Sequence, residues 1–100
     1  MRRELTATER YWIEEALIQE PTLSAEDRGK YKLQIPKLRV VEECDCGDPT
    51  CGSIKFSHYV RGLSYGFADA VIDQGSPEEM RVAIFINHES DKLSEIETIK

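Results

Sequence analysis

The hydrophobic pattern changes its period at Pro36, and this change constrains the fold more than any other feature of the sequence. Before Pro36, apolar residues such as Ile13 and Leu17 recur at helical spacing, whereas after it they alternate with polar residues as in half-buried strands. Helices followed by strands are typical of the α+β class. We therefore predict two N-terminal helices packed on an antiparallel meander of four to five strands.

Capping residues and prolines set the bounds of the two predicted helices. Thr6 and Glu9 have the spacing of a capping box, in which each side chain accepts from the other residue's backbone N–H. Pro21 ends this first helix, because the residue before a proline avoids helical conformation. Ser24 is a second N-cap candidate, and Pro36 closes the segment that follows it. The helices are predicted over 7–19 and 24–35.

The connections between the strand patterns are short, which favours antiparallel neighbours because a parallel crossover needs a dozen or more residues. The pattern over 80–87 is apolar on both faces and predicts a central strand. The pattern over 93–99 fits either an edge strand with interleaved charges or a short helix. An edge there would allow a homodimer. A single domain over 1–100 is predicted, with strands at about 38–44, 53–60, 67–73, 80–87 and 93–99.

Acidic residues are in excess, and they concentrate in the second half of the chain. Thirteen Lys and Arg oppose nineteen Asp and Glu, for a formal net charge of −6. Such a surface repels nucleic acid and anionic lipid and attracts basic protein patches, although it also serves solubility alone. No apolar run approaches the roughly 20 residues that span a bilayer. We therefore expect a cytoplasmic protein with a protein partner and no nucleic-acid or membrane partner.

Three cysteines lie close together in the motif C-D-C-G-D-P-T-C-G. The odd number argues against a full disulfide framework. Three hypotheses remain, namely a tetrahedral zinc site, a reactive thiol, and structural thiols at a strand connection. Neighbouring carboxylates disfavour the reactive thiol, because they disfavour the thiolate form. The zinc hypothesis uses Cys44, Cys46, Cys51 and His58, with Asp45 or Asp48 as substitute donors.

No group of residues in the sequence forms a convincing catalytic set. The segment G-L-S-Y-G over 62–66 has the spacing of a nucleophile elbow, but that motif belongs to a large parallel sheet that this pattern does not predict. His58 and His88 fall on separate strand patterns. Trp12 is interpreted as an anchor of the first helix in the core. We therefore predict that the protein is not an enzyme.

The first half of the chain resembles a group of small uncharacterised bacterial proteins. The resemblance rests on L-T-x-x-E at residues 5–9, a cysteine- or glycine-rich hairpin after Val41, and G-S-I-x-F at residues 52–56. Some of these proteins resemble the immunity proteins of bacterial toxin systems. The resemblance spans residues 3–56 and implies a compact α+β domain without known catalysis. It carries no functional residue over to this chain.

Two functional hypotheses follow from these observations. The first is a small acidic protein-binding domain without catalysis, of the inhibitor or immunity type, and the second is a small zinc-binding domain organised by the three cysteines. For the first, charged side chains would steer a basic partner and aromatic side chains would anchor it. The predicted partner contacts are Asp45, Asp48, Asp69, Asp73, Glu78 and Glu79, with Tyr59 and Tyr65 as anchors.

Overall fold

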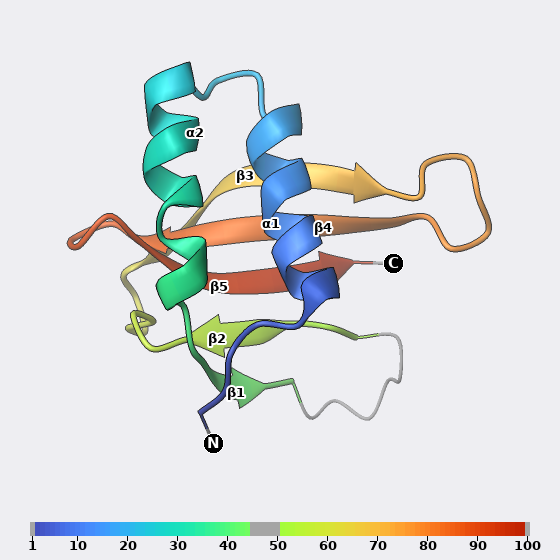
Figure 1. Ribbon diagram of the computed structural model, residues 1–100. Helices are drawn as coiled ribbons and strands as arrows, with labels where there is room; N and C mark the ends of the chain where they lie inside the picture. The colour runs from blue at the N-terminus through green and yellow to red at the C-terminus, as the bar shows by residue number, and fades with distance from the viewer. Residues whose placement is uncertain (1, 45–50, 100) are drawn as a thin grey trace.

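The computed structural model describes residues 2–44 and 51–99. Within these residues the chain forms two α-helices, one short 3-10 helix and a five-stranded antiparallel sheet (Figure 1). The predicted α+β class is therefore confirmed. Neither described α-helix is long and apolar enough to cross a membrane. The elements are α1 (Ala7–Gln19), α2 (Ala25–Lys32), η1 (Ile35–Lys37), β1 (Val40–Glu43), β2 (Ile54–Phe56), β3 (Ser64–Ile72), β4 (Met80–Asn87) and β5 (Lys92–Ile99).

The strands lie in the order β1-β2-β5-β4-β3, so the predicted meander is wrong in the position of its last strand. The segment predicted as an edge strand or a short helix is β5, and it lies between β2 and β4. Leu93 and Ile96 are 0% exposed, while Glu95 and Glu97 face the solvated side of the sheet. The charged residues that alternate with apolar ones in this strand therefore indicate a solvated face of the sheet and not a strand at its edge. A homodimer through β5 therefore has no edge to use.

Both α-helices lie on the same side of the sheet (Figure 1). The ring of Tyr31 on α2 lies 4.7 Å from that of Phe67 on β3, centroid to centroid. Burial of apolar side chains between the helices and the sheet supplies the main driving force for the fold. The buried core consists of Ile13, Ala16, Leu17, Tyr31, Ile35, Leu38, Val40, Ile54, Phe56, Ala68, Ala70, Ile72, Val82, Ile84, Leu93 and Ile96.

The helix ends follow the capping residues, with one correction. The capping box is present: the Thr6 hydroxyl accepts from the Glu9 N–H at 3.1 Å, and the Glu9 carboxylate accepts from the Thr6 N–H at 2.9 Å. The Ser24 hydroxyl accepts from the N–H of Asp27 and begins α2. However, α2 ends at Lys32, three residues before the predicted end. The chain tightens there into η1, where Pro36 has no N–H to continue an α-helix.

The strand predicted over 53–60 is too long, because β2 ends at Phe56. The N–H of Tyr59 donates to the carbonyl of Phe56 at 3.0 Å, which turns the chain directly after the strand. His58 is exposed in this turn, and its carbonyl accepts from the side-chain amide of Asn87. His58 therefore does not share a strand face with Ile54. Alternating polarity continued past the strand end, so the pattern alone could not place the turn.

Candidate functional site

Among the described elements, no helix covers the side of the sheet that faces away from α1 and α2 (Figure 1). Cross-strand pairs show which residues share it, since directly opposed residues project on the same side. Lys55 pairs with Glu42 on β1 and with Glu95 on β5, and further pairs continue the row across β4 to β3. We call this surface the open face. It comprises Glu42, Lys55, Asp69, Val71, Arg81, Ala83, Phe85, Glu95, Glu97 and Ile99.

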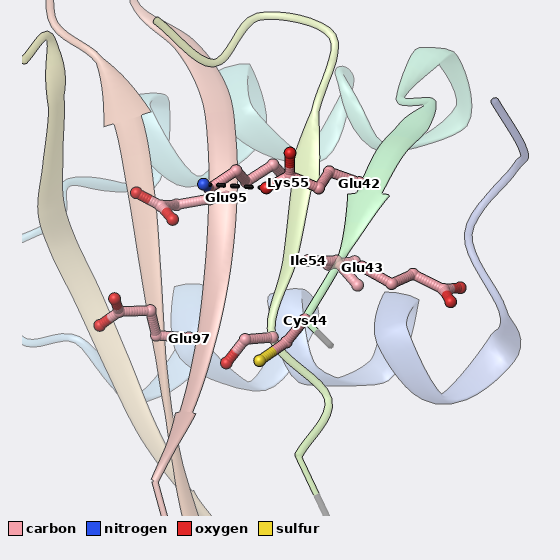
Figure 2. Close-up of a pocket in the computed structure, with 8 residues that line it drawn as sticks. Glu42, Glu43, Cys44, Ile54, Lys55, Glu95 and Glu97 are labelled. Carbon is pink, nitrogen blue, oxygen red and sulfur yellow. Dashed lines mark ion pairs between the residues drawn. The ribbon is translucent and has the colours of Figure 1, made fainter. Parts of the chain in front are cut away.

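A shallow groove of about 530 Å³ runs over the part of the open face formed by β1, β2 and β5. Figure 2 views it from the open face, with the helices behind the sheet. Carboxylates dominate its walls, so a cation or a cationic side chain is the chemistry that it would attract. We call it the acidic groove. It is lined by Glu42, Glu43, Cys44, Ser53, Ile54, Lys55, Glu95 and Glu97.

Lys55 is the one cation among the lining residues, and it is already engaged. Its ammonium lies 3.0 Å from the carboxylate of Glu42 (Figure 2). It also lies 4.6 Å from the ring centroid of Tyr59. The hydrogen bond to Glu42 is the largest cause that raises the pKa of Lys55, and the charge of Glu95 adds to it. Lys55 therefore stays protonated at neutral pH. It offsets part of the negative charge of the groove. The Glu95 carboxylate also accepts from the Ser64 hydroxyl at 2.9 Å, and Glu97 has no matching cation among the lining residues.

Glu43 lines the groove but points away from it (Figure 2). Its carboxylate pairs with Arg3 at 2.8 Å, and the same guanidinium makes two further 2.8 Å contacts to Glu9. Burial raises the pKa of Glu9, but the bonds from Arg3 and from the Thr6 N–H outweigh it and hold that pKa below its usual value. Arg3 therefore ties the N-terminal segment to α1 and β1. The charge of Glu43 serves this structural tie and is already matched.

The predicted partner contacts do not gather at one place. Tyr59 lies beside the acidic groove, where its ring contacts Lys55. Tyr65 is 56% exposed on β3, with its ring 4.9 Å from that of His88, and Asp69 lies on the open face at the same outer strand. The remaining described contacts occupy the turn between β3 and β4, and two predicted contacts lie outside the described residues. Those in the turn are Asp73, Glu78 and Glu79, and those outside are Asp45 and Asp48.

The predicted zinc ligands are placed only in part. Cys44 is exposed after β1, and its N–H donates to the Ser53 carbonyl across the β1–β2 ladder, while Cys51 is half-buried before β2. His58 follows the opposite end of β2 from Cys51. Cys46 lies outside the described residues. Within residues 2–44 and 51–99, no three metal-binding side chains are grouped so that they could hold an ion.

Sequence reasoning missed the four charged residues that form the acidic groove across three strands: Glu42, Lys55, Glu95 and Glu97. A partial signal was present, because Glu95 and Glu97 alternate with the buried Ile96 and so belong to one strand face. The pairing of β2 with β5 was needed to bring Lys55 beside Glu95. Nothing in the local sequence indicates that pairing.

The function of the acidic groove has to be argued from its own residues. Comparison of the chain with models of protein families, with curated proteins and with solved structures finds no match. The resemblance to immunity proteins, which rests on short motifs in residues 3–56, stays a prediction. The geometry and charge of the open face are therefore the basis on which a function can be proposed.

Proposed function

We propose that this chain is a protein-binding domain without catalysis that holds a basic, extended segment of a partner protein on its open face. One observation carries the proposal: Glu42, Glu95 and Glu97 come from two different strands and line one groove on the side of the sheet away from the helices. Complementary charge of this kind raises the association rate and selects the partner. A cytoplasmic inhibitor or immunity-type protein would use its surface in this way.

The same charges argue against the other classes of partner. Nucleic acid and anionic lipid carry the sign of the groove, so both would be repelled. Two open faces packed against each other would bring Glu95 and Glu97 near the same carboxylates of a second copy, and like charges at an interface cost several kcal/mol. A partner with lysine or arginine side chains meets the groove without that cost. We therefore assign the groove to a basic protein segment.

Apolar side chains next to the groove supply a place for anchoring contacts. Phe85 pairs with Glu95 across the β4–β5 ladder and is half-buried, and Ile99 at the end of β5 is 56% exposed. Affinity at interfaces usually depends on a few such apolar or aromatic contacts, with charge acting at the rim. The segment that fits best is thus one in which cationic and apolar residues alternate. A strand has this alternation with a period of two.

A selection of binding peptides from a random library tests this proposal. We expect enriched peptides to be rich in lysine and arginine, and to lose at least about tenfold in affinity on the double variant Glu95→Lys/Glu97→Lys, a change of about 1.4 kcal/mol. The matched control is Glu26→Lys/Glu89→Lys, which changes the net charge equally at exposed positions on α2 and in the turn between β4 and β5. Binding to the control should fall by less than a factor of about three.

Two results would contradict the proposal. One is enrichment of peptides without a cationic bias, or no enrichment at all. The other is an equal loss of affinity on both double variants, which would show that only the overall charge matters and that the groove has no special role. Far-UV circular dichroism of both variants establishes that each is folded before binding is compared.

A zinc-binding domain is the second candidate, and one observation favours it. Cys44 and Cys51 both lie at the base of the β1–β2 connection, where Cys44 bonds to Ser53. Structural zinc contributes directly to folding free energy, so its removal would lower the melting temperature. Close to one zinc per chain after purification without chelator, together with a lower Tm in EDTA, would favour this candidate. Little zinc and an unchanged Tm in EDTA would exclude a structural zinc site and leave protein binding as the remaining proposal.

A further inference from the structure

The ammonium group of Lys55 occupies the acidic groove in the way that a bound cation would. It pairs with the Glu42 carboxylate at 3.0 Å (Figure 2). It also lies over the ring of Tyr59, 4.6 Å from the centroid, and the charge of Glu95 acts on it. Carboxylates and the faces of aromatic rings are groups with which proteins hold ammonium and guanidinium groups. The groove thus contains a receptor for a cationic side chain, and the chain fills this receptor with its own lysine.

This internal cation is held weakly enough to be exchanged. The side chains of Lys55 and Glu42 are 35% and 62% exposed. Exposed ion pairs contribute little to stability, because water competes for both charges and the pair orders two long side chains. A cation over a half-buried ring such as that of Tyr59 adds a comparable amount. A second cation of the same chemistry can therefore take the place of Lys55 without a large loss elsewhere in the fold.

We infer that Lys55 is an internal competitor for the acidic groove, and that a cationic side chain of the partner takes its place at Glu42 and Tyr59 when the segment docks. The inference rests on the proposed function and goes beyond it, because it identifies the side chain that the partner must displace. The flexible four-carbon stem of Lys55 lets the ammonium swing away while β2 stays in place. Lys55 therefore lowers the affinity of the groove for every basic segment that uses Glu42.

The inference makes Glu42 and Glu97 differ in their contributions to binding. Glu97 has no matching cation among the lining residues, so a partner cation binds there without displacing another. At Glu42, a partner cation replaces one ion pair with another, and the binding free energy stays almost unchanged. Glu42 therefore contributes to binding only when Lys55 is absent. The effects of Lys55 and Glu42 should be coupled, whereas those of Lys55 and Glu97 should be close to additive.

Peptide binding to the variant Lys55→Met tests the inference, because methionine keeps an unbranched stem on β2 and removes the charge. We expect a peptide of alternating lysine and valine to bind this variant at least about fivefold more tightly than the wild type at physiological ionic strength. Lys32→Met, at an exposed position on α2, is the matched control for net charge. It should change the affinity by less than about twofold, because salt screens a distant charge. Lys55→Arg keeps the competitor and should bind no more tightly than the wild type.

A double-mutant cycle separates displacement from a general effect of charge. Glu42→Gln should leave peptide binding nearly unchanged in the wild type and weaken it by at least about threefold in the Lys55→Met background. Glu97→Gln is the control and should weaken binding by the same factor in both backgrounds. Far-UV circular dichroism establishes that each variant is folded. Equal effects of Glu42→Gln in the two backgrounds would overturn the inference.

The side chain of Lys55 also reports on its own displacement by NMR. Hydrogens above an aromatic ring resonate upfield, so the Lys55 ε-methylene should be shifted upfield in the free protein. It should return to the ordinary lysine position when the peptide saturates the groove.

The outcomes separate the inference from the proposed function. An ε-methylene shift that is unchanged at saturation would overturn the inference and leave the proposed function standing. The same holds if peptide affinity for Lys55→Met does not exceed that of the wild type, or if Lys32→Met gains as much. Absence of peptide binding to both the wild type and Lys55→Met would instead overturn the proposed function, and the inference with it.

Discussion

Replacing Gly52 with alanine is expected to lower the free energy of unfolding by about 2 kcal/mol. A Cβ at this position would lie 2.6 and 2.9 Å from two carbon atoms of the Trp12 ring, far inside van der Waals contact. The half-buried indole packs against the core and cannot move without losing contacts. Chemical denaturation measures the loss. Because Trp12 is the only tryptophan, its emission reports directly on the displaced ring.

Gly66→Ala is the control for this prediction. Its Cβ would lie 3.6 Å from the ring of Phe85, which is an ordinary contact distance. The same chemical change on β3 should therefore alter the free energy of unfolding by less than about 1 kcal/mol in either direction. Equal effects at both positions would show that the close approach of Trp12 to Gly52 has no energetic consequence, and would contradict the account of this contact.

Replacing Glu9 with glutamine is expected to lower the free energy of unfolding by about 2 kcal/mol at neutral pH. Glu9 is 7% exposed, and its carboxylate accepts two bonds from Arg3 and one from the Thr6 N–H. Glutamine fills the same volume but leaves Arg3 without this counter-charge. The loss is smaller than for a fully buried pair, because Arg3 is partly exposed and keeps Glu43.

The pH dependence of this effect has a definite sign. The pKa of Glu9 is lowered in the folded state, so its contribution is fully present above the ordinary value of 4.5 and is lost as the pH falls through the lower, folded value. The stabilities of the wild type and of Glu9→Gln should therefore converge below about pH 4. Glu26→Gln, at an exposed position on α2, is the control and should show no such convergence. A difference in stability between the wild type and Glu9→Gln that is the same at every pH would contradict the assignment of this stabilisation to the ionised Glu9 carboxylate.

The local parts of the fold could be predicted, because the residues that specify them are neighbours in sequence. The capping box and Pro21 specify α1 over Ala7–Gln19, as predicted. The contact of Trp12 with Gly52 could not be predicted, since forty residues separate them and only the packing of α1 on the sheet brings them together. Arg3 was missed for the same reason: its partner Glu43 lies on β1.

The candidate site depends even more strongly on long-range pairing. The acidic bias of the second half of the chain indicates acidic partner contacts, but three of the predicted ones, Asp73, Glu78 and Glu79, lie in the β3–β4 turn. The acidic groove instead combines Glu42 on β1 with Glu95 on β5, and its formation requires β5 to insert beside β2. Leu93 and Ile96 are buried in this interior strand, whereas the sequence pattern around them fits either an edge strand or a short helix.

The most direct test of the protein-binding proposal is an NMR titration of the ¹⁵N-labelled chain at low salt with a peptide of alternating lysine and valine. We expect saturable chemical-shift changes at the backbone amides of Glu42, Lys55, Glu95 and Glu97, with smaller changes at Phe85. These changes should disappear as salt is added. The chemical shifts of the amides in α1 and α2, on the far side of the sheet, should not change. Shifts centred on the helices, or none that saturate, would contradict the proposal.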